Sequence, residues 1–126
     1  MKNNVGVWID HRKAVIVSLA DEVEKTTRIT SHMEKHVRFF RGANDASAED
    51  QRDRRLRGHL VKYYERVVSC IRDADSILIL GPGEAKVELR TRLESEALGG
   101  RIAGIETVDK MTDRQLAAKV RHHFSQ

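Results

Sequence analysis

The sequence has little of what marks secreted, membrane-spanning or disulfide-stabilised proteins. Its single cysteine, Cys70, cannot form an internal disulfide and therefore favours a reducing compartment. No apolar run approaches the roughly 20 residues that span a bilayer, and the amino-terminal residues have no signal-peptide pattern. We therefore expect a cytoplasmic protein without a membrane partner.

The sequence also lacks the patterns of common catalytic, cofactor and metal sites. His32 and His36 are four residues apart, but they fall in a predicted loop and have no cysteine at zinc-binding spacing. No Walker loop, dinucleotide fingerprint or nucleophile with a neighbouring base is evident. We expect no metal, no cofactor and no catalytic residues, which favours a binding module over an enzyme.

The excess positive charge lies in one part of the chain. Residues 35–66 contain nine Lys or Arg and five Asp or Glu, and this difference of +4 equals the net charge of the whole protein. The remaining residues contain 14 basic and 14 acidic side chains and are neutral. A clustered excess of cations suits a polyanionic partner such as RNA.

Apolar periodicity predicts the secondary structure. Alternating or continuous apolar runs predict strands at 5–10, 13–20, 22–30, 76–80 and 101–108. Apolar residues at three- and four-residue spacing predict helices at about 49–72, 84–98 and 112–124. A capping box begins the last helix at Thr112, and Gly99-Gly100 is expected to end the second. Residues 31–48 follow no period and predict a long loop.

The order of these elements predicts the fold class. A meander of three strands followed by alternating helices and strands (β-β-β-α-β-α-β-α) gives an α/β domain with a mixed five-stranded sheet and helices packed on it, the ribonuclease H-like architecture. The all-apolar strand 76–80 is expected to be parallel and covered on both faces. Cys70 is expected to be a small buried hydrophobe. Residues 1–126 form one domain in this interpretation.

Three stretches of the chain, residues 7–16, 52–67 and 77–89, carry a family resemblance. In them an Asp ends the first strand, an Arg-rich helix follows the loop, and an apolar strand runs into a glycine turn, a Lys and a helix. The sequence is similar to the middle domain of the archaeo-eukaryotic peptide-chain release factors and of Pelota, the ribosome-rescue relative, and to small bacterial translational machinery proteins. The resemblance implies a role at the ribosome, in translation termination or ribosome rescue.

The chain departs from the release factors in the loop before its long helix. Release factors carry a Gly-Gly-Gln tripeptide there that coordinates hydrolysis of peptidyl-tRNA. Residues 38–45 here read RFFRGAND, and no Gly-Gly-Gln occurs in the sequence. The resemblance therefore does not imply release activity, and in this respect the chain is closer to Pelota.

The loop and helix within residues 35–66 form the candidate RNA-binding surface. Lys and Arg contact phosphates irrespective of base sequence, and two Phe side chains between Arg residues could stack on unpaired bases. The candidate residues are Lys35, Arg38, Phe39, Phe40, Arg41, Arg52, Arg55, His59, Lys62 and Arg66. The alternative is a solvated helix face with local ion pairs, in which the two Phe residues anchor the loop to the core.

Two further positions have a functional and a simpler interpretation. Gly81 and Gly83, with Lys86, could bind an anion through backbone N–H groups at a helix start, but we favour a tight turn in which glycine supplies unusual dihedral angles. Asp10 matches the position of a catalytic Asp in ribonuclease H-type nucleases. Because strand 76–80 contributes no second acid for a two-metal site, we interpret Asp10 as a turn residue that bonds its own backbone.

The alternating strand 22–30 supports an alternative function of a different class. It is expected to lie half exposed at the sheet edge, where it could pair with a second copy of the chain. A homodimeric protein-interaction module without nucleic-acid binding is therefore the alternative to an RNA-binding module. A phosphoester or peptidyl-tRNA hydrolase is the least favoured of the three.

Overall fold

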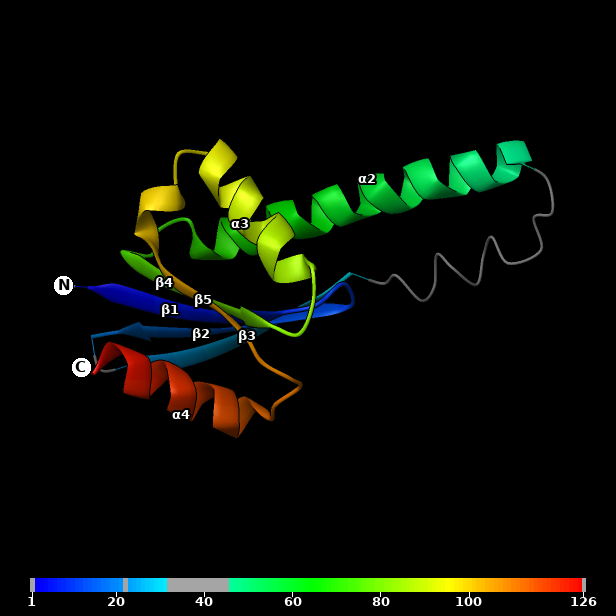
Figure 1. Cartoon of the computed structure of the whole chain (residues 1–126). Coiled ribbons are helices and arrows are strands. Elements are labelled where there is room, and N and C mark those ends of the chain that lie inside the picture. The colour runs from blue at the N-terminus through cyan, green and yellow to red at the C-terminus, as the bar shows by residue number, and fades with distance from the viewer. Residues whose placement is uncertain (1, 22, 32–45, 126) are drawn as a thin grey trace.

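The computed structural model describes residues 2–21, 23–31 and 46–125, and in the long helix it describes the side chains of Arg54 and of residues 57–71. A single sheet carries helices on both faces (Figure 1). The elements are β1 (Asn3–Ile9), β2 (Lys13–Ala20), β3 (Val23–Thr30), α2 (Ala46–Ile71), β4 (Ser76–Gly81), α3 (Ala85–Ser95), the 3₁₀ turn η1 (Gly99–Arg101), β5 (Ile102–Thr107) and α4 (Asp113–Phe124). None of the helices in these ranges is long and apolar enough to cross a membrane.

The five strands form one mixed sheet in the order β3-β2-β1-β4-β5. β1 and β2 pair antiparallel, as do β2 and β3, whereas β4 pairs parallel with both β1 and β5. A hairpin can join antiparallel neighbours, but a parallel pair requires a crossover, which α2 and α3 provide. The predicted ribonuclease H-like α/β architecture is confirmed, and β3 lies at the edge of the sheet as expected.

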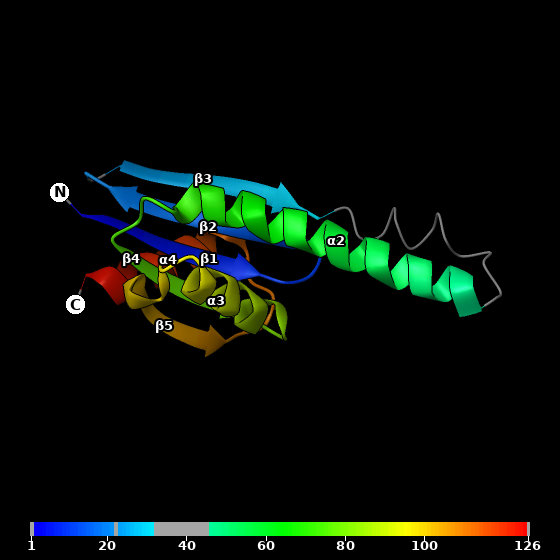
Figure 2. The ribbon, with the colours of Figure 1, turned by 90° about the horizontal axis from the view of Figure 1, so that it is seen from above.

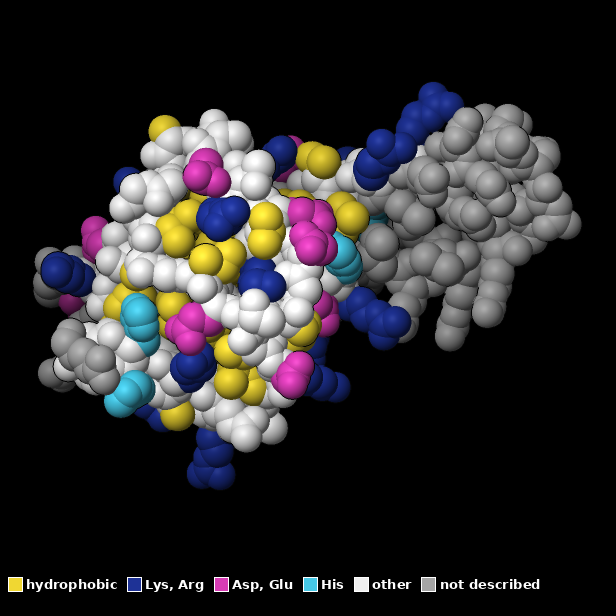
Figure 3. Space-filling model, in the orientation of Figure 1, with side chains coloured by type: hydrophobic (Ala, Val, Ile, Leu, Met, Phe, Trp, Pro, Cys, Tyr) yellow, Lys and Arg dark blue, Asp and Glu magenta, His cyan; other side chains and the backbone are white. Residues whose placement is uncertain are grey.

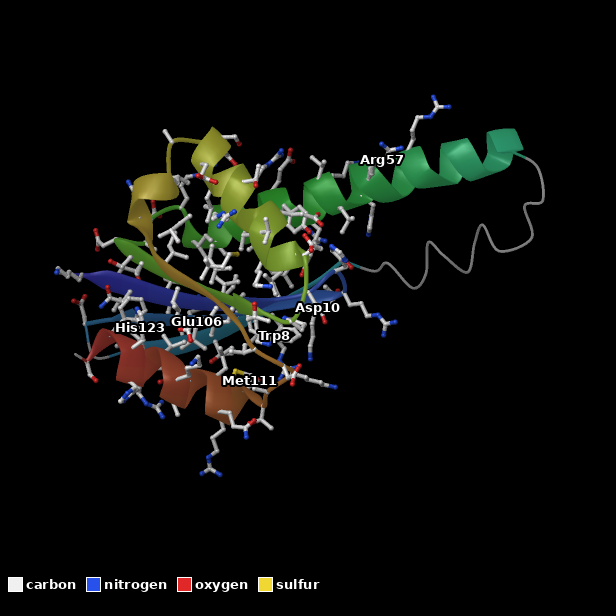
Figure 4. All side chains as sticks on the ribbon, viewed as in Figure 1. Trp8, Asp10, Arg57, Glu106, Met111 and His123 are labelled. Carbon is white, nitrogen blue, oxygen red and sulfur yellow. The ribbon has the colours of Figure 1, made fainter. Side chains whose placement is uncertain are left out.

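The strand pleat divides the core into two layers. Ile77 and Ile79 of β4 pack in the layer beneath α2 and α3, while Leu78 and Leu80 pack in the layer beneath α4. All four of these side chains are fully buried, so β4 is covered on both faces as its sequence predicts. Trp8 of β1 lies in the α4 layer, as Figure 4 shows.

One predicted helix end is confirmed by the structure and another is not. The capping box of α4 is confirmed, because Gln115 N–H donates to the Thr112 hydroxyl at 3.1 Å. The prediction that Gly99-Gly100 ends the second helix is wrong. α3 ends at Ser95, and Ala97 takes the left-handed conformation (φ 62°), with the N–H of Leu98 bonded to the carbonyl of Leu93. This is the Schellman arrangement, with Ala in the place usually held by Gly.

Two other predictions are corrected by the geometry. Cys70 is exposed rather than buried, because its neighbour Ile71 faces the core and consecutive helical residues point about 100° apart. Gly81 does not supply an unusual dihedral angle, since no described glycine has positive φ. It is required for close approach instead: a Cβ at Gly81 would lie 2.3 Å from the carbonyl oxygen of Ile9 on the neighbouring strand.

Candidate nucleic-acid interface

The long helix α2 is anchored at one end and projects from the sheet at the other. Its carboxyl-terminal part places Tyr63, Val67 and Ile71 in the core at four-residue spacing. Its amino-terminal part extends beyond the end of the sheet (Figures 1 and 2). The helix therefore presents a surface on several sides where it leaves the core.

Exposed cations follow α2 from the projecting part to the anchored part. Arg54, Arg57, Lys62 and Arg66 are all exposed. Figure 3 shows Lys and Arg side chains extending from the region where α2 leaves the sheet, and Figure 4 labels Arg57 there. These cations occupy more than one side of the helix, which suits a ligand that wraps the helix better than a flat one.

Residues 57–71 contain one acidic side chain, that of Glu65. Its carboxylate binds Arg92 Nη2 of α3 at 2.7 Å. Arg92 also lies 3.7 Å from Glu96, which in turn pairs with Arg72 at 2.6 Å. This network of two acids and two bases is electrically balanced by itself, so Glu65 is engaged by a cation of α3.

Three of the predicted residues come together beside β3. His59, Lys62 and Arg66 line one shallow hollow with Glu65 and Ser69. Arg66 is held there, because its Nη2 donates to the backbone carbonyl of Thr30 at 2.8 Å. Residues three and four positions apart share a helix face, and the structure places these three side chains on one.

The other predicted RNA-binding positions lie outside what the structure describes. These are residues Lys35, Arg38, Phe39, Phe40 and Arg41, together with the side chains of Arg52 and Arg55. Their part in the surface stays a prediction.

The turn that contains Gly81 and Gly83 is hydrogen-bonded to the lysine that follows it. Lys86 Nζ donates to the carbonyl of Gly83 at 2.7 Å. The first turn of α3 also carries Glu88, and Glu84 precedes the helix. The anion-binding role of Gly81, Gly83 and Lys86 stays a prediction, with two carboxylates close to the proposed anion.

A polar cluster that the sequence did not reveal lies at the carboxyl ends of β1 and β4. Glu88 accepts a hydrogen bond from the Tyr64 hydroxyl at 2.8 Å, and its other oxygen lies 2.9 Å from His11 Nε2. The neighbouring Tyr63 hydroxyl donates to the backbone carbonyl of Asp10 at 3.0 Å. The adjacent tyrosines in an otherwise periodic helix were the available signal, but their partners come from other elements.

Both tyrosines of this cluster are held in the neutral, hydrogen-bond-donating form. Burial raises the pKa of Tyr63, and the negative charge of Asp10 adds to the effect. Burial likewise raises the pKa of Tyr64, with the hydrogen bond to Glu88 as the next cause. The cluster therefore ties α2 to α3 and to the β1–β2 turn through fixed donors.

Asp10 serves the turn between β1 and β2, as predicted. Its Oδ1 accepts from the backbone N–H groups of Arg12 and Lys13, each at 2.8 Å. Across residues 2–21, 23–31 and the described side chains after residue 53, no three His, Cys, Asp or Glu residues are grouped so that they could hold a metal ion.

Comparisons with known proteins identify the fold. No family model and no curated protein matches the sequence. The structure is similar to that of Pelota from Thermoplasma acidophilum, with a TM-score of 0.65 and 15% identity over 96% of this chain and 32% of Pelota. Pelota from Archaeoglobus fulgidus gives a TM-score of 0.60 and 12% identity over 96% of this chain and 31% of that one.

An archaeal translation termination factor is similar to the same degree. Its TM-score is 0.60 at 12% identity, over 98% of this chain and 35% of the factor. The resemblance to Pelota and the release factors is thereby confirmed for the fold. The chain spans about a third of the length of these proteins.

Proposed function

We propose that this chain is a noncatalytic module that docks on ribosomal or other structured RNA, related in role to translation termination or ribosome rescue. The contact surface is the 35–66 segment. The observation that carries the proposal is the projecting helix α2, which exposes Arg54, Arg57, Lys62 and Arg66 while the acid Glu65 pairs with Arg92 of α3. The fold shared with Pelota and with an archaeal termination factor supports the ribosome as the place of action.

The physical basis is the release of counterions from RNA. Each cation that neutralises a phosphate makes the logarithm of the binding constant depend more steeply on the logarithm of the salt concentration, by about 0.7 to 0.9 per contact. A helix with cations on several sides can follow the backbone of a folded RNA without reading its bases. The proposed binding is therefore strong at low salt and weakly dependent on sequence.

The test is a salt titration of binding to purified ribosomes and to a structured RNA. We expect the variant Arg54→Gln/Arg57→Gln/Lys62→Gln to bind weakly, with the slope reduced by about 2 to 3. A second variant neutralises Arg38, Arg41, Arg52 and Arg55 and tests the remainder of the segment.

The matched control changes net charge equally elsewhere. Lys2, Lys110 and Arg114 are exposed and lie outside the 35–66 segment, so Lys2→Gln/Lys110→Gln/Arg114→Gln is expected to keep most of the affinity. Equal losses in the two triple variants would show nonspecific attraction and contradict the proposal. No binding of the parent chain at low salt would contradict it as well.

The noncatalytic part of the proposal has its own test. The chain lacks Gly-Gly-Gln, and Asp10 is engaged by the turn that it closes. We expect no hydrolysis of peptidyl-tRNA or of phosphoesters with divalent metal. Turnover that is abolished by Asp10→Asn would overturn this part and favour a hydrolase.

A further inference from the structure

The edge strand β3 exposes a set of backbone groups that can be assigned from the register. Asp10 N–H donates to the carbonyl of Lys13, which closes the β1–β2 turn with a hydrogen-bonded pair. In an antiparallel ladder, hydrogen-bonded and non-hydrogen-bonded residue pairs alternate along the strand. The odd-numbered residues of β2 therefore bond to β1 and its even-numbered residues to β3. Each even residue of β2 opposes an odd residue of β3, for example Ile16 opposite Thr27.

It follows that the even-numbered residues of β3 direct their N–H and C=O groups away from the sheet. Arg66 confirms this direction, because it donates to the outward carbonyl of Thr30. Among the described strands, β3 has a neighbour on one side only, and Figure 2 shows it outermost. Glu24, Thr26 and Arg28 thus present a row of backbone groups to a further strand.

The side chains of β3 are complementary to a second β3 running antiparallel about Thr26. In that register Glu24 of each copy faces Arg28 of the other, on the face that carries α4. The exposed Val23, with 65% of its surface accessible, faces Ile29 on the opposite face. Ile29 already packs against the core beneath α2, so the contact would extend that core across the new pair.

We propose that a second copy of this chain adds its β3 to β3 with Thr26 opposite Thr26, so that two sheets join into one across a two-fold axis. The outward groups of Glu24, Thr26 and Arg28 then supply about six main-chain hydrogen bonds. The proposal does not rest on RNA binding, because β3 precedes the 35–66 segment.

Other registers that use the same backbone groups fit less well. Centring on Glu24, Lys25 or Arg28 sets a charged residue against itself, which destabilises a strand pair. Centring on Thr27 places Glu24 against Thr30, whose carbonyl is already bonded to Arg66. Within the bounds of β3, the Thr26 register alone among these pairs opposite charges twice.

The ion pairs that Glu24 and Arg28 already make within the chain do not compete with the proposed contact between two copies. Glu24 binds Arg121, and Arg28 binds Asp113, both on α4. Opposing Glu24 to Arg28 of the partner copy links these pairs into one alternating array. A carboxylate placed between two guanidinium groups gains attraction from both.

The test is sedimentation equilibrium of the full chain, its charge-reversal variants and their mixture. We expect the parent chain to dimerise. Arg28→Glu alone sets Glu against Glu24, and Glu24→Arg alone sets Arg against Arg28, so each is expected to weaken self-association by about tenfold or more. Mixing the two variants restores both opposite-charge pairs between the copies, and we expect a heterodimer that forms at least tenfold more tightly than either variant self-associates.

The mixture separates this register from a general effect of charge or folding. A misfolded variant would not regain affinity on mixing, and circular dichroism checks the fold of each. Thr26→Pro provides an independent block, since it removes an outward N–H without touching the bonds to β2. A parent chain that is monomeric at high concentration, or variants whose mixture does not associate, would overturn the proposal.

Discussion

One methyl group added at Gly81 provides a sharp test of how the sheet is packed. The Cβ of Gly81→Ala would lie 2.3 Å from the carbonyl oxygen of Ile9, whereas ordinary van der Waals contact begins at 3.4 Å. The deficit of 1.1 Å (3.4 minus 2.3) falls on a backbone atom of β1, which cannot rotate away. β1 and β4 are both fully buried at this end of their pairing, so the strands must separate.

The expected loss in the free energy of unfolding follows from the rigidity of the core. Overpacking a well-packed interior typically costs about 1 to 3 kcal/mol, and we expect Gly81→Ala at the upper end, about 3 kcal/mol. Urea unfolding followed by circular dichroism measures the free energy of unfolding directly. A thermal melt should show a fall of roughly 10 °C, at about 4 °C per kcal/mol for a chain of this size.

The same substitution in α2 is the control. Gly58 is exposed in the interior of the helix, and a Cβ there would meet nothing within 4 Å. Because Gly is about 1 kcal/mol less favourable than Ala in a helix, Gly58→Ala should stabilise by up to that amount. A neutral Gly81→Ala, or a Gly58→Ala that loses stability, would refute the reasoning.

Three further predictions concern helix ends and the tyrosine cluster. Ala97→Gly should stabilise the protein by about 1 kcal/mol in urea unfolding, because Gly adopts positive φ without the Cβ penalty. Thr112→Ala should cost about 1 kcal/mol in the same assay, through loss of the capping box. The raised pKa values of Tyr63 and Tyr64 mean that the folded chain holds these protons more tightly than the unfolded chain. The contribution of these two tyrosines to the free energy of unfolding should therefore be intact below pH about 10 and fall above it. A smaller loss of stability at alkaline pH is expected in Tyr64→Phe.

The sheet could be predicted because its residues carry the information locally. The continuous apolar run of β4 and the alternation of β3 each determine their burial and their place in the sheet. The end of α3 could not be predicted in the same way. An Ala in the left-handed conformation at position 97 depends on how Leu98 packs, and the sequence offers Gly99 as a more obvious stop.

The candidate surface was predictable only where it lies along one helix. Helical spacing alone is enough to bring His59, Lys62 and Arg66 together, so their grouping does not depend on a tertiary contact. The contact between His11 and Glu88 joins residues 77 positions apart, and it exists only because α3 crosses near the β1–β2 turn. Pairs of that kind follow from the fold and leave no pattern in the sequence.

The projecting part of α2 has a consequence for how its order is maintained. Arg54, Arg57 and Gly58 are exposed, so helical order at these three positions depends on intrinsic propensity, and short helical stretches without packing are marginal in water. Their amide hydrogens should exchange with solvent sooner than those of residues 63–71. A ligand that binds the projecting part of α2 would also stabilise its helical structure. Slower exchange of the amide hydrogens there would therefore report ligand binding without a label on either partner.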